Sequence, residues 1–227
     1  RTAEGIPTEV ITVEDAISGM PGRDDAEKLR NYLIDYHDDN GIQYLLLGGD
    51  TDLVPFRKAY AMTCEAGFHI REDSLPCDLY FGDLDGDWDA NGNGVFGELY
   101  DNVDMWPELH VGRAPVENVA EAEAFVGKIA AYEDLLAEDF FQKALFLAAI
   151  LWSNPFTDSS QSKELIDQNH MPYYFDITKL YEVLGNENLA NTMIALNQGT
   201  NMINHDGHAW YNSIGVGAGD YMAAEHM

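Results

Sequence analysis

Short apolar runs alternate along this chain with segments of helical periodicity, and this alternation leaves few possible architectures. Tyr44–Leu47 contains only apolar residues, which is typical of a strand buried in a parallel sheet. The segment before it has Asp24 or Asp25 as a candidate helix cap and stops at Gly41. An earlier strand is expected around Val10–Val13. Together these segments predict a strand–helix–strand unit.

The alternation returns further along the chain. Leu109–Arg113 is predicted to be a strand, and Val116–Leu136 a long helix. The apolar residues expected to face inward on that helix are Val119, Ala122, Phe125, Val126 and Ile129. The later elements are expected at Ala144–Leu151 (strand), Ser159–Asn169 (helix), Tyr173–Phe175 (strand or edge segment), Asn188–Asn197 (helix) and Thr200–Asn204 (strand). This order predicts an α/β fold of mainly parallel sheets flanked by helices.

The length of 227 residues allows one large domain or two smaller subdomains. We place a subdomain boundary near Glu138–Asp139, which separates residues 1–138 from residues 139–227. The segment 55–107, between the predicted strands at 44–47 and 109–113, is acidic and has little periodicity. It is too long to serve only as a loop that connects two strands.

The charge of the chain excludes some classes of partner. Forty acidic residues against twelve basic ones give a formal net charge of -28. This balance argues against nucleic acid and against anionic membrane surfaces, both of which attract Lys and Arg. No apolar run approaches the length of about 20 residues that a membrane-spanning helix needs. Arg1–Gly5 also lacks the apolar region of a signal peptide, so we expect an internal fragment or a processed piece.

Two cysteines, Cys64 and Cys77, lie in the acidic segment. They are either joined in a disulfide, which would indicate an oxidising compartment, or two unrelated thiols. Asp78 follows Cys77, and a neighbouring carboxylate raises a thiol pKa, so this cysteine does not resemble a nucleophile.

A calcium-loop pattern, D-x-[DN]-x-[DN]-G-x5-E, is matched in full by residues 87–98. The predicted ligands are Asp87, Asp89, Asn91, Asn93 and Glu98. Oxygen ligands without His or Cys favour calcium over zinc, and we expect the ion to have a structural role. The flanks of the loop are expected to be extended, unlike the paired helices of an EF-hand. Two alternatives stay open: a solvated turn, and a ligand set that includes Asp83 or Asp85.

His208 follows a short strand and Gly207. The carboxyl end of a strand in an α/β sheet is where such folds place their chemistry, so His208 is a candidate general base. Without further support, however, a polar loop histidine is the commoner explanation.

Four strings together resemble the gingipain-type cysteine peptidases, which have a caspase-like fold. The strings are YLLLGGDTDLVP (44–55), DLYFGDLDGD (78–87), PELHVGRAP (107–115) and NHDGH (204–208), and they occur in the family's order over nearly the whole chain. The resemblance implies a secreted or cell-surface endopeptidase with a Cys–His dyad, acting on proteins or peptides.

The resemblance also implies roles for single residues. His208 matches the catalytic histidine, Gly207 and Ala209 match its glycine-rich surroundings, and Glu108 matches the acidic residue that orients the imidazole. Ala209 stands where the family has glycine, but its backbone N–H can still serve an oxyanion. The family's nucleophilic cysteine would lie beyond Met227. It is therefore carried by a second chain from the same precursor, lost by truncation, or absent from an inactive protein.

Two other functional classes share features with this sequence. A calcineurin-like metallophosphoesterase shares Asn204–Asp206 and an Asp35–His37 motif, but the latter is predicted on a helix and the spacing of the other ligands does not fit. The stronger alternative is a non-catalytic, calcium-binding, secreted α/β module, an inactive relative of the peptidases.

Overall fold

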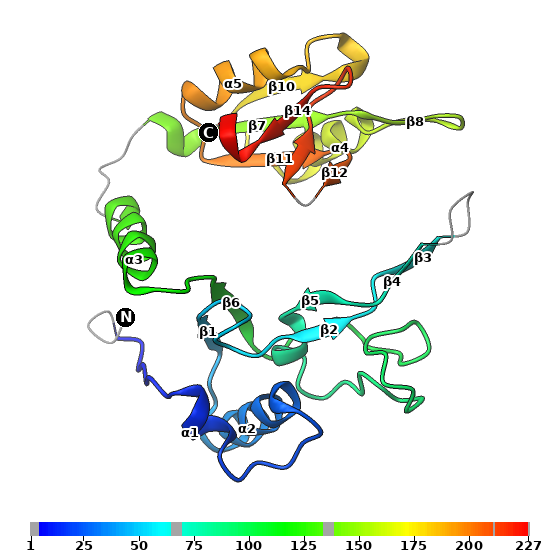
Figure 1. The fold of residues 1–227 in the computed structure, drawn as a ribbon. Helices are drawn as coiled ribbons and strands as arrows, with labels where there is room; N and C mark the ends of the chain where they lie inside the picture. The colour runs from blue at the N-terminus through cyan, green and yellow to red at the C-terminus, as the bar shows by residue number, and fades with distance from the viewer. Residues whose placement is uncertain (1–4, 65–69, 134–138, 211, 227) are drawn as a thin grey trace. The chain divides into compact units, whose positions relative to one another are not determined.

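A computed structural model describes residues 5–64, 70–133, 139–210 and 212–226. It divides the chain into two units, residues 1–133 and residues 134–227 (Figure 1). The boundary expected at Glu138–Asp139 adjoins residues 134–138, which lie outside the described part of the chain. Within the described residues five α-helices accompany parallel strand pairs, so the predicted α/β class is confirmed.

Unit 1 contains the following elements in chain order: α1 (Val13–Ile17), α2 (Asp25–Asn40), β1 (Tyr44–Gly48), β2 (Arg57–Ala59), β3 (Met62–Cys64), β4 (Ile70–Glu72), β5 (Leu75–Cys77), the 3-10 turn η2 (Leu79–Phe81), β6 (His110–Ala114) and α3 (Val119–Glu133). β1 and β6 pair in parallel, with Tyr44 opposite His110 and Gly48 opposite Ala114. The predicted strands at 44–47 and 109–113 are therefore confirmed.

Helix α2 begins and ends where its capping residues predict. The Asp24 side chain accepts a hydrogen bond from the Glu27 N–H, and Gly41 ends the helix in the left-handed conformation (φ 65°). The buried face of α2 packs in a core with residues from β1, η2 and the start of β6. Its most deeply buried members are Leu29, Leu33, Leu47, Tyr80, Phe81 and Leu109.

The strand expected around Val10–Val13 is wrong. Residues 6–12 form no strand, and α1 begins at Val13. The Thr12 side chain accepts a hydrogen bond from the Asp15 N–H, so it caps a helix in spite of the β-branched residues around it.

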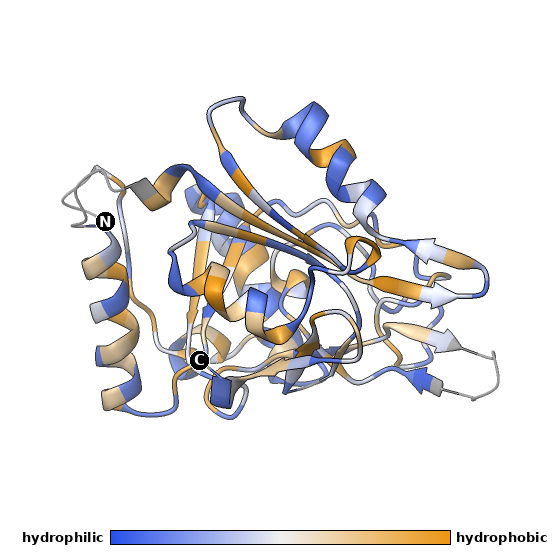
Figure 2. Ribbon diagram, turned by 90° about the horizontal axis from the view of Figure 1, so that it is seen from above, coloured by the Kyte–Doolittle hydropathy of each residue, from blue (hydrophilic) through white to orange (hydrophobic). Residues whose placement is uncertain are grey.

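The apolar stripe of α3 is only partly covered, contrary to the prediction: Ala122 and Phe125 are half-buried, whereas Val119, Val126 and Ile129 are exposed. Val119 is 74% exposed, Val126 63% and Ile129 41%, and no side chain of this helix is buried. Figure 2 shows hydrophobic and hydrophilic residues alternating along the helix. Helical periodicity specifies that such a stripe exists, but it does not specify what covers it.

The acidic segment between β1 and β6 is short of regular structure, as predicted. Its strands form two antiparallel pairs, β2 with β5 and β3 with β4. The Arg113 guanidinium, at the end of β6, organises much of the remainder. It makes a two-pronged ion pair with Asp78, and it donates to the carbonyls of Gly49, Val54 and Pro55 at 2.9–3.0 Å.

Unit 2 contains η3 (Asp139–Gln142), β7 (Lys143–Ala148), β8 (Ile150–Ser153), β9 (Phe156–Asp158), α4 (Ser160–His170), β10 (Asp176–Tyr181), η4 (Glu182–Leu184), α5 (Leu189–Asn197), β11 (Met202–Asp206), β12 (Ala209–Trp210), β13 (Ser213–Gly215), β14 (Tyr221–Ala223) and η5 (Ala224–His226). The predicted strand at Tyr173–Phe175 is wrong, because these residues form a turn and the strand begins at Asp176.

The sheet of unit 2 has the order β10-β7-β11, and all three strands are parallel. β7 is the central strand, and its Leu145, Phe146 and Leu147 are at most 1% exposed. The predicted strand at Ala144–Leu151 is split in two, because β8 leaves the sheet and pairs with β9 in a hairpin. No described helix of either unit is both long enough and apolar enough to cross a membrane.

Arg113→Lys is expected to destabilise unit 1 by about 2 kcal/mol or more, because an ammonium group cannot replace the planar fork that reaches Asp78 and three carbonyls. Urea unfolding followed by circular dichroism measures the loss. Arg71→Lys is the matched control: the Arg71 side chain is 51% exposed, so its surface ion pairs are expected to contribute less than about 1 kcal/mol. Equal losses in both variants would contradict this view of Arg113.

Candidate functional site

His208 lies where the sequence places it, beyond the carboxyl end of β11. The last residue of this strand, Asp206, is paired with Ala148 of β7, so the histidine follows the carboxyl edge of a parallel sheet. The side chain of His208 is exposed. It is therefore accessible to another molecule or to another part of the chain.

Two residues of β8 hold the imidazole ring of His208. Its Nε2 lies 2.8 Å from the carbonyl oxygen of Leu151, and the Trp152 ring meets it edge-on with centroids 5.0 Å apart. Because a carbonyl oxygen can only accept, Nε2 must carry the hydrogen. In the neutral ring the lone pair is then on Nδ1, which is the nitrogen able to take a proton.

The backbone around His208 is held by the hairpin that follows it. The Gly215 N–H donates to the His208 carbonyl at 2.7 Å, and the His205 ring Nε2 donates to the Gly215 carbonyl at 2.7 Å. A Cβ on Gly207 would lie only 2.8 Å from that ring nitrogen, so glycine is required there. Ala209 pairs with Ile214 in the β12–β13 ladder.

Two buried charged side chains of unit 2, Lys163 and Glu187, were not predicted from the sequence. Lys163 of α4 is 3% exposed and donates to the Asn204 side chain at 2.5 Å, and its Nζ lies 3.8 Å from the Asp206 carboxylate. Glu187 is 1% exposed, and neither of its carboxylate oxygens has a hydrogen-bond partner. Burial, with a contribution from the charge of Glu182, raises the pKa of Glu187 to about 7.

Glu108 belongs to unit 1, and its described contacts lie within that unit. Its Oε2 accepts a hydrogen bond from the Leu84 N–H at 2.7 Å. Its carboxylate also lies close to those of Asp83 and Asp85, with one oxygen of each within 4.8 Å of the others. The sequence suggested Asp83 and Asp85 as alternative ligands for the acidic loop, but it did not connect either of them with Glu108.

The predicted calcium loop brings three of its five candidate ligands together. The side-chain amides of Asn91 and Asn93 both donate to Glu98 Oε2, at 3.2 and 2.6 Å. Asp87 instead accepts from the Asp89 N–H at 3.1 Å. The extended flanks that were expected are wrong: Leu79–Phe81 before the loop form the 3-10 turn η2, and residues 99–100 after it form a turn.

Arginine side chains reach two of the loop carboxylates. Arg23 lies 2.5 Å from Asp89, and its hydrogen bond holds the pKa of that carboxyl below its usual range. Arg71 lies 3.3 Å from Glu98. The carboxylates of the loop are thus directed toward positive charge, although no three of them gather as closely as Asp83, Asp85 and Glu108 do.

Cys77 carries a free thiol, so the structure favours separate thiols over a disulfide. Burial raises the pKa of this thiol, which makes it a poor nucleophile, as expected from the sequence. The side chain of Cys64 lies outside the described part of the chain.

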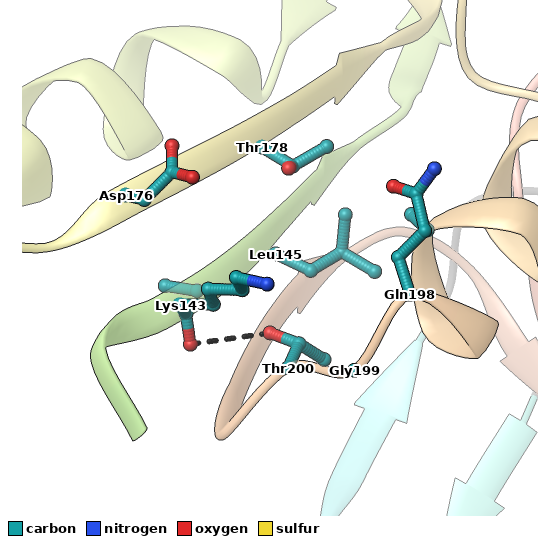
Figure 3. Close-up of a pocket in the computed structure, with 9 residues that line it drawn as sticks. Lys143, Leu145, Asp176, Thr178, Gln198, Gly199 and Thr200 are labelled. Carbon is teal, nitrogen blue, oxygen red and sulfur yellow. Dashed lines mark hydrogen bonds between the residues drawn. The ribbon is translucent and has the colours of Figure 1, made fainter. Parts of the chain in front are cut away.

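A small cavity of about 100 Å³ lies at the opposite edge of the unit 2 sheet (Figure 3). Lys143 and Asp176, at the amino ends of β7 and β10, line it together with Thr200, whose hydroxyl donates to the Lys143 carbonyl at 3.2 Å. Parallel sheets place ligands at their carboxyl ends, so we assign this cavity no role in the site around His208.

Comparison with known proteins decides the family. A model of peptidase family C25 matches residues 1–226. The chain belongs to peptidase family C25. The predicted resemblance to gingipain-type peptidases is thereby confirmed, whereas a search of curated proteins found no match.

A solved structure described as "Structure of Protease" shares the fold of this family C25 chain. Its TM-score is 0.61 and its sequence identity 15%, and the alignment covers 88% of this chain. The chain spans 38% of the length of that protease. At this identity the likeness concerns the fold alone.

The pKa of Glu187 predicts a pH-dependent stability. Between its usual value of 4.5 and about 7, the folded chain binds a proton that the unfolded chain has lost. The free energy of unfolding should therefore fall as pH rises through this range, by up to about 3 kcal/mol. Glu187→Gln keeps the side chain neutral and is expected to gain stability over the parent protein at pH 8 but not at pH 4.5, as measured by urea unfolding. The exposed Glu225→Gln serves as control, and an equal gain there would contradict the prediction.

Proposed function

We propose that this chain is the histidine-bearing part of a secreted or cell-surface cysteine endopeptidase with a caspase-like fold. One observation carries the proposal: in a member of peptidase family C25, His208 is exposed beyond the carboxyl edge of a parallel sheet, with Nε2 anchored to the Leu151 carbonyl. Its substrates are proteins or peptides.

The anchored ring suggests how His208 would act. Nδ1 accepts the proton of a cysteine thiol, and the thiolate attacks the carbonyl carbon of the scissile peptide bond. Backbone N–H groups beside the ring, those of Gly207 and Ala209, are proposed to stabilise the oxyanion. The imidazolium then returns the proton to the departing amine, and water hydrolyses the acyl-enzyme. The Leu151 carbonyl keeps the hydrogen on Nε2 throughout, so Nδ1 is the nitrogen that takes and returns the proton.

The nucleophile is proposed to lie on a further strand beside β11. β11 is an outer strand of the described β10-β7-β11 sheet, so one of its edges faces away from β7. A parallel strand added there would end at the same edge as β11, next to His208. That strand would belong to a later segment of the same precursor or to a second chain cut from it.

Glu108 and the 87–98 loop also have proposed roles in the enzyme. As the resemblance implies, Glu108 is proposed to support His208; with Nε2 held by Leu151 and Nδ1 taking the thiol proton, its part would be to stabilise the imidazolium by its negative charge. The loop is proposed to bind one structural calcium ion through Asp87, Asp89, Asn91, Asn93 and Glu98. Asn91 and Asn93 both lie within hydrogen-bond distance of Glu98, so three of the five proposed ligands are already close together.

His208→Ala in the whole protein, including the segment that carries the thiol, is expected to lower kcat/KM for peptide hydrolysis by about 10²–10⁴-fold, because the general base is lost. The melting temperature should change little, since the side chain is exposed. His170→Ala removes an exposed histidine at the end of α4 and should leave the rate unchanged. Iodoacetamide should abolish the parent activity. Full activity of His208→Ala would reject the mechanism. If no segment carrying a cysteine thiol is found that gives peptidase activity together with this chain, a non-catalytic calcium-binding module is the better explanation.

Glu98→Gln is expected to weaken calcium binding by the loop at least tenfold, because the side chain on which the asparagines converge loses its charge. Calorimetric titration of EDTA-stripped protein with CaCl2 measures the affinity. Glu123→Gln removes one exposed carboxylate from α3 and controls for net charge. If both variants bind calcium as the parent does, the loop is not a calcium site.

A further inference from the structure

Strand β8 brings an exposed tryptophan against the proposed base. The Trp152 ring meets the His208 ring edge-on, with centroids 5.0 Å apart and an angle of 76° between the ring planes. In spite of this contact, Trp152 is 59% exposed. Because a tryptophan side chain can bury about 150–250 Å², a large apolar surface stays open directly beside His208.

The hairpin that carries Trp152 is held at its base, although it reaches out beyond the unit 2 sheet (Figure 1). The Ile150 N–H donates to the Glu182 carboxylate at 2.7 Å. The next carbonyl along the strand, that of Leu151, accepts from the His208 ring at 2.8 Å. A side chain on a strand that is fixed in this way keeps its place, so Trp152 is suited to form one wall of a binding site.

In the proposed reaction, one residue of the substrate comes close to this ring. His208 Nδ1 returns a proton to the departing amine, so the nitrogen of that amine must come within about 2.6–3.2 Å of the imidazole. This nitrogen belongs to the residue that follows the scissile bond. The side chain of that residue begins only two bonds further on, at its Cβ, and it therefore lies within reach of Trp152.

An apolar side chain suits this place better than a charged one. During the proposed reaction the His208 ring becomes an imidazolium ion. A lysine or arginine of the substrate beside it would oppose this positive charge. A substrate carboxylate would raise the pKa of the imidazole and slow the return of the proton. An aliphatic or aromatic side chain does neither, and it covers the open surface of Trp152.

We propose, resting on the function proposed above, that Trp152 is a specificity-determining residue of the peptidase. Its ring contacts the side chain of the residue that immediately follows the scissile bond, and it selects an aromatic or large aliphatic side chain there. The preferred substrates are therefore polypeptides that carry a residue such as Phe or Leu directly after the bond that is cleaved.

Phe156 offers a matched control on the same hairpin. It is 61% exposed, close to the 59% of Trp152. Trp152 is paired with Thr157, whereas Phe156 is paired with Ser153, the next residue of β8. Because successive residues of a strand point to opposite faces, Phe156 lies on the face of the hairpin away from Trp152. An effect common to all exposed aromatic residues of the hairpin would appear in both variants.

Peptide hydrolysis by the whole protein tests the proposal with substrates that differ only in the residue after the scissile bond. The parent protein is expected to have a kcat/KM about tenfold or more higher with Phe than with Ser at this place, the size usual for an apolar contact. Trp152→Ala should bring this ratio to about one, because the contact is lost. Trp152→Phe should keep most of the preference, and Phe156→Ala all of it.

Three results of this experiment would overturn the proposal. The first is an unchanged ratio in Trp152→Ala. The second is an equal loss with every substrate together with a lower melting temperature, because Trp152 would then pack against the rest of the protein and not against the substrate. The third is a parent enzyme that prefers Lys or Arg after the scissile bond, which would rule out an apolar side chain there.

A binding measurement on the 227-residue chain separates this proposal from the peptidase mechanism. Phe-Ala-amide and Ser-Ala-amide carry the free amine that cleavage would release. Each is titrated into the chain while NMR follows the ring protons of His208. Phe-Ala-amide is expected to bind about tenfold or more tightly than Ser-Ala-amide to the parent, but not to Trp152→Ala. Such a preference supports the subsite even if the whole protein hydrolyses no peptide. Equal binding of the two peptides would overturn it even if the peptidase is active.

Discussion

The guanidinium of Arg113 is the contact on which unit 1 most depends. Its N–H groups make five hydrogen bonds, to Asp78 and to the carbonyls of Gly49, Val54 and Pro55. These carbonyls belong to irregular backbone, where no sheet or helix supplies donors. Arg30 does the same for the turn after η2. A chain with twelve basic residues against forty acidic ones thus uses two of its few cationic side chains to hydrogen-bond backbone carbonyls in irregular segments.

Regular elements could be predicted because their signals are local. α2 has its cap at Asp24 and its stop at Gly41, and β1 is a purely apolar run. The acidic segment could not be predicted, because its shape depends on arginines that are distant in sequence. α1 was missed for the opposite reason: one local hydrogen bond at Thr12 outweighed the β-propensity of its neighbours.

The candidate site, too, could be predicted only in part from the sequence. The position of His208 follows from a strand, a glycine and the family resemblance, all of which are visible in the sequence. Its anchoring does not, because the Leu151 carbonyl reaches the ring only after β8 has left the sheet and folded into a hairpin. The cluster of Asp83, Asp85 and Glu108 was equally invisible, since two segments must meet before it exists. The buried Glu187 gave no sequence signal of its own.

The order of the strands in the unit 2 sheet, β10-β7-β11, differs from the order in which they are synthesised. β7 emerges from the ribosome first, but both of its partners, β10 and β11, are made later. The apolar side chains of β7 therefore stay unpaired until α4, α5 and the strands that follow them have been synthesised. Apolar surface exposed for this time favours association with chaperones. His208 follows β11, so the proposed base is positioned only when the sheet is complete.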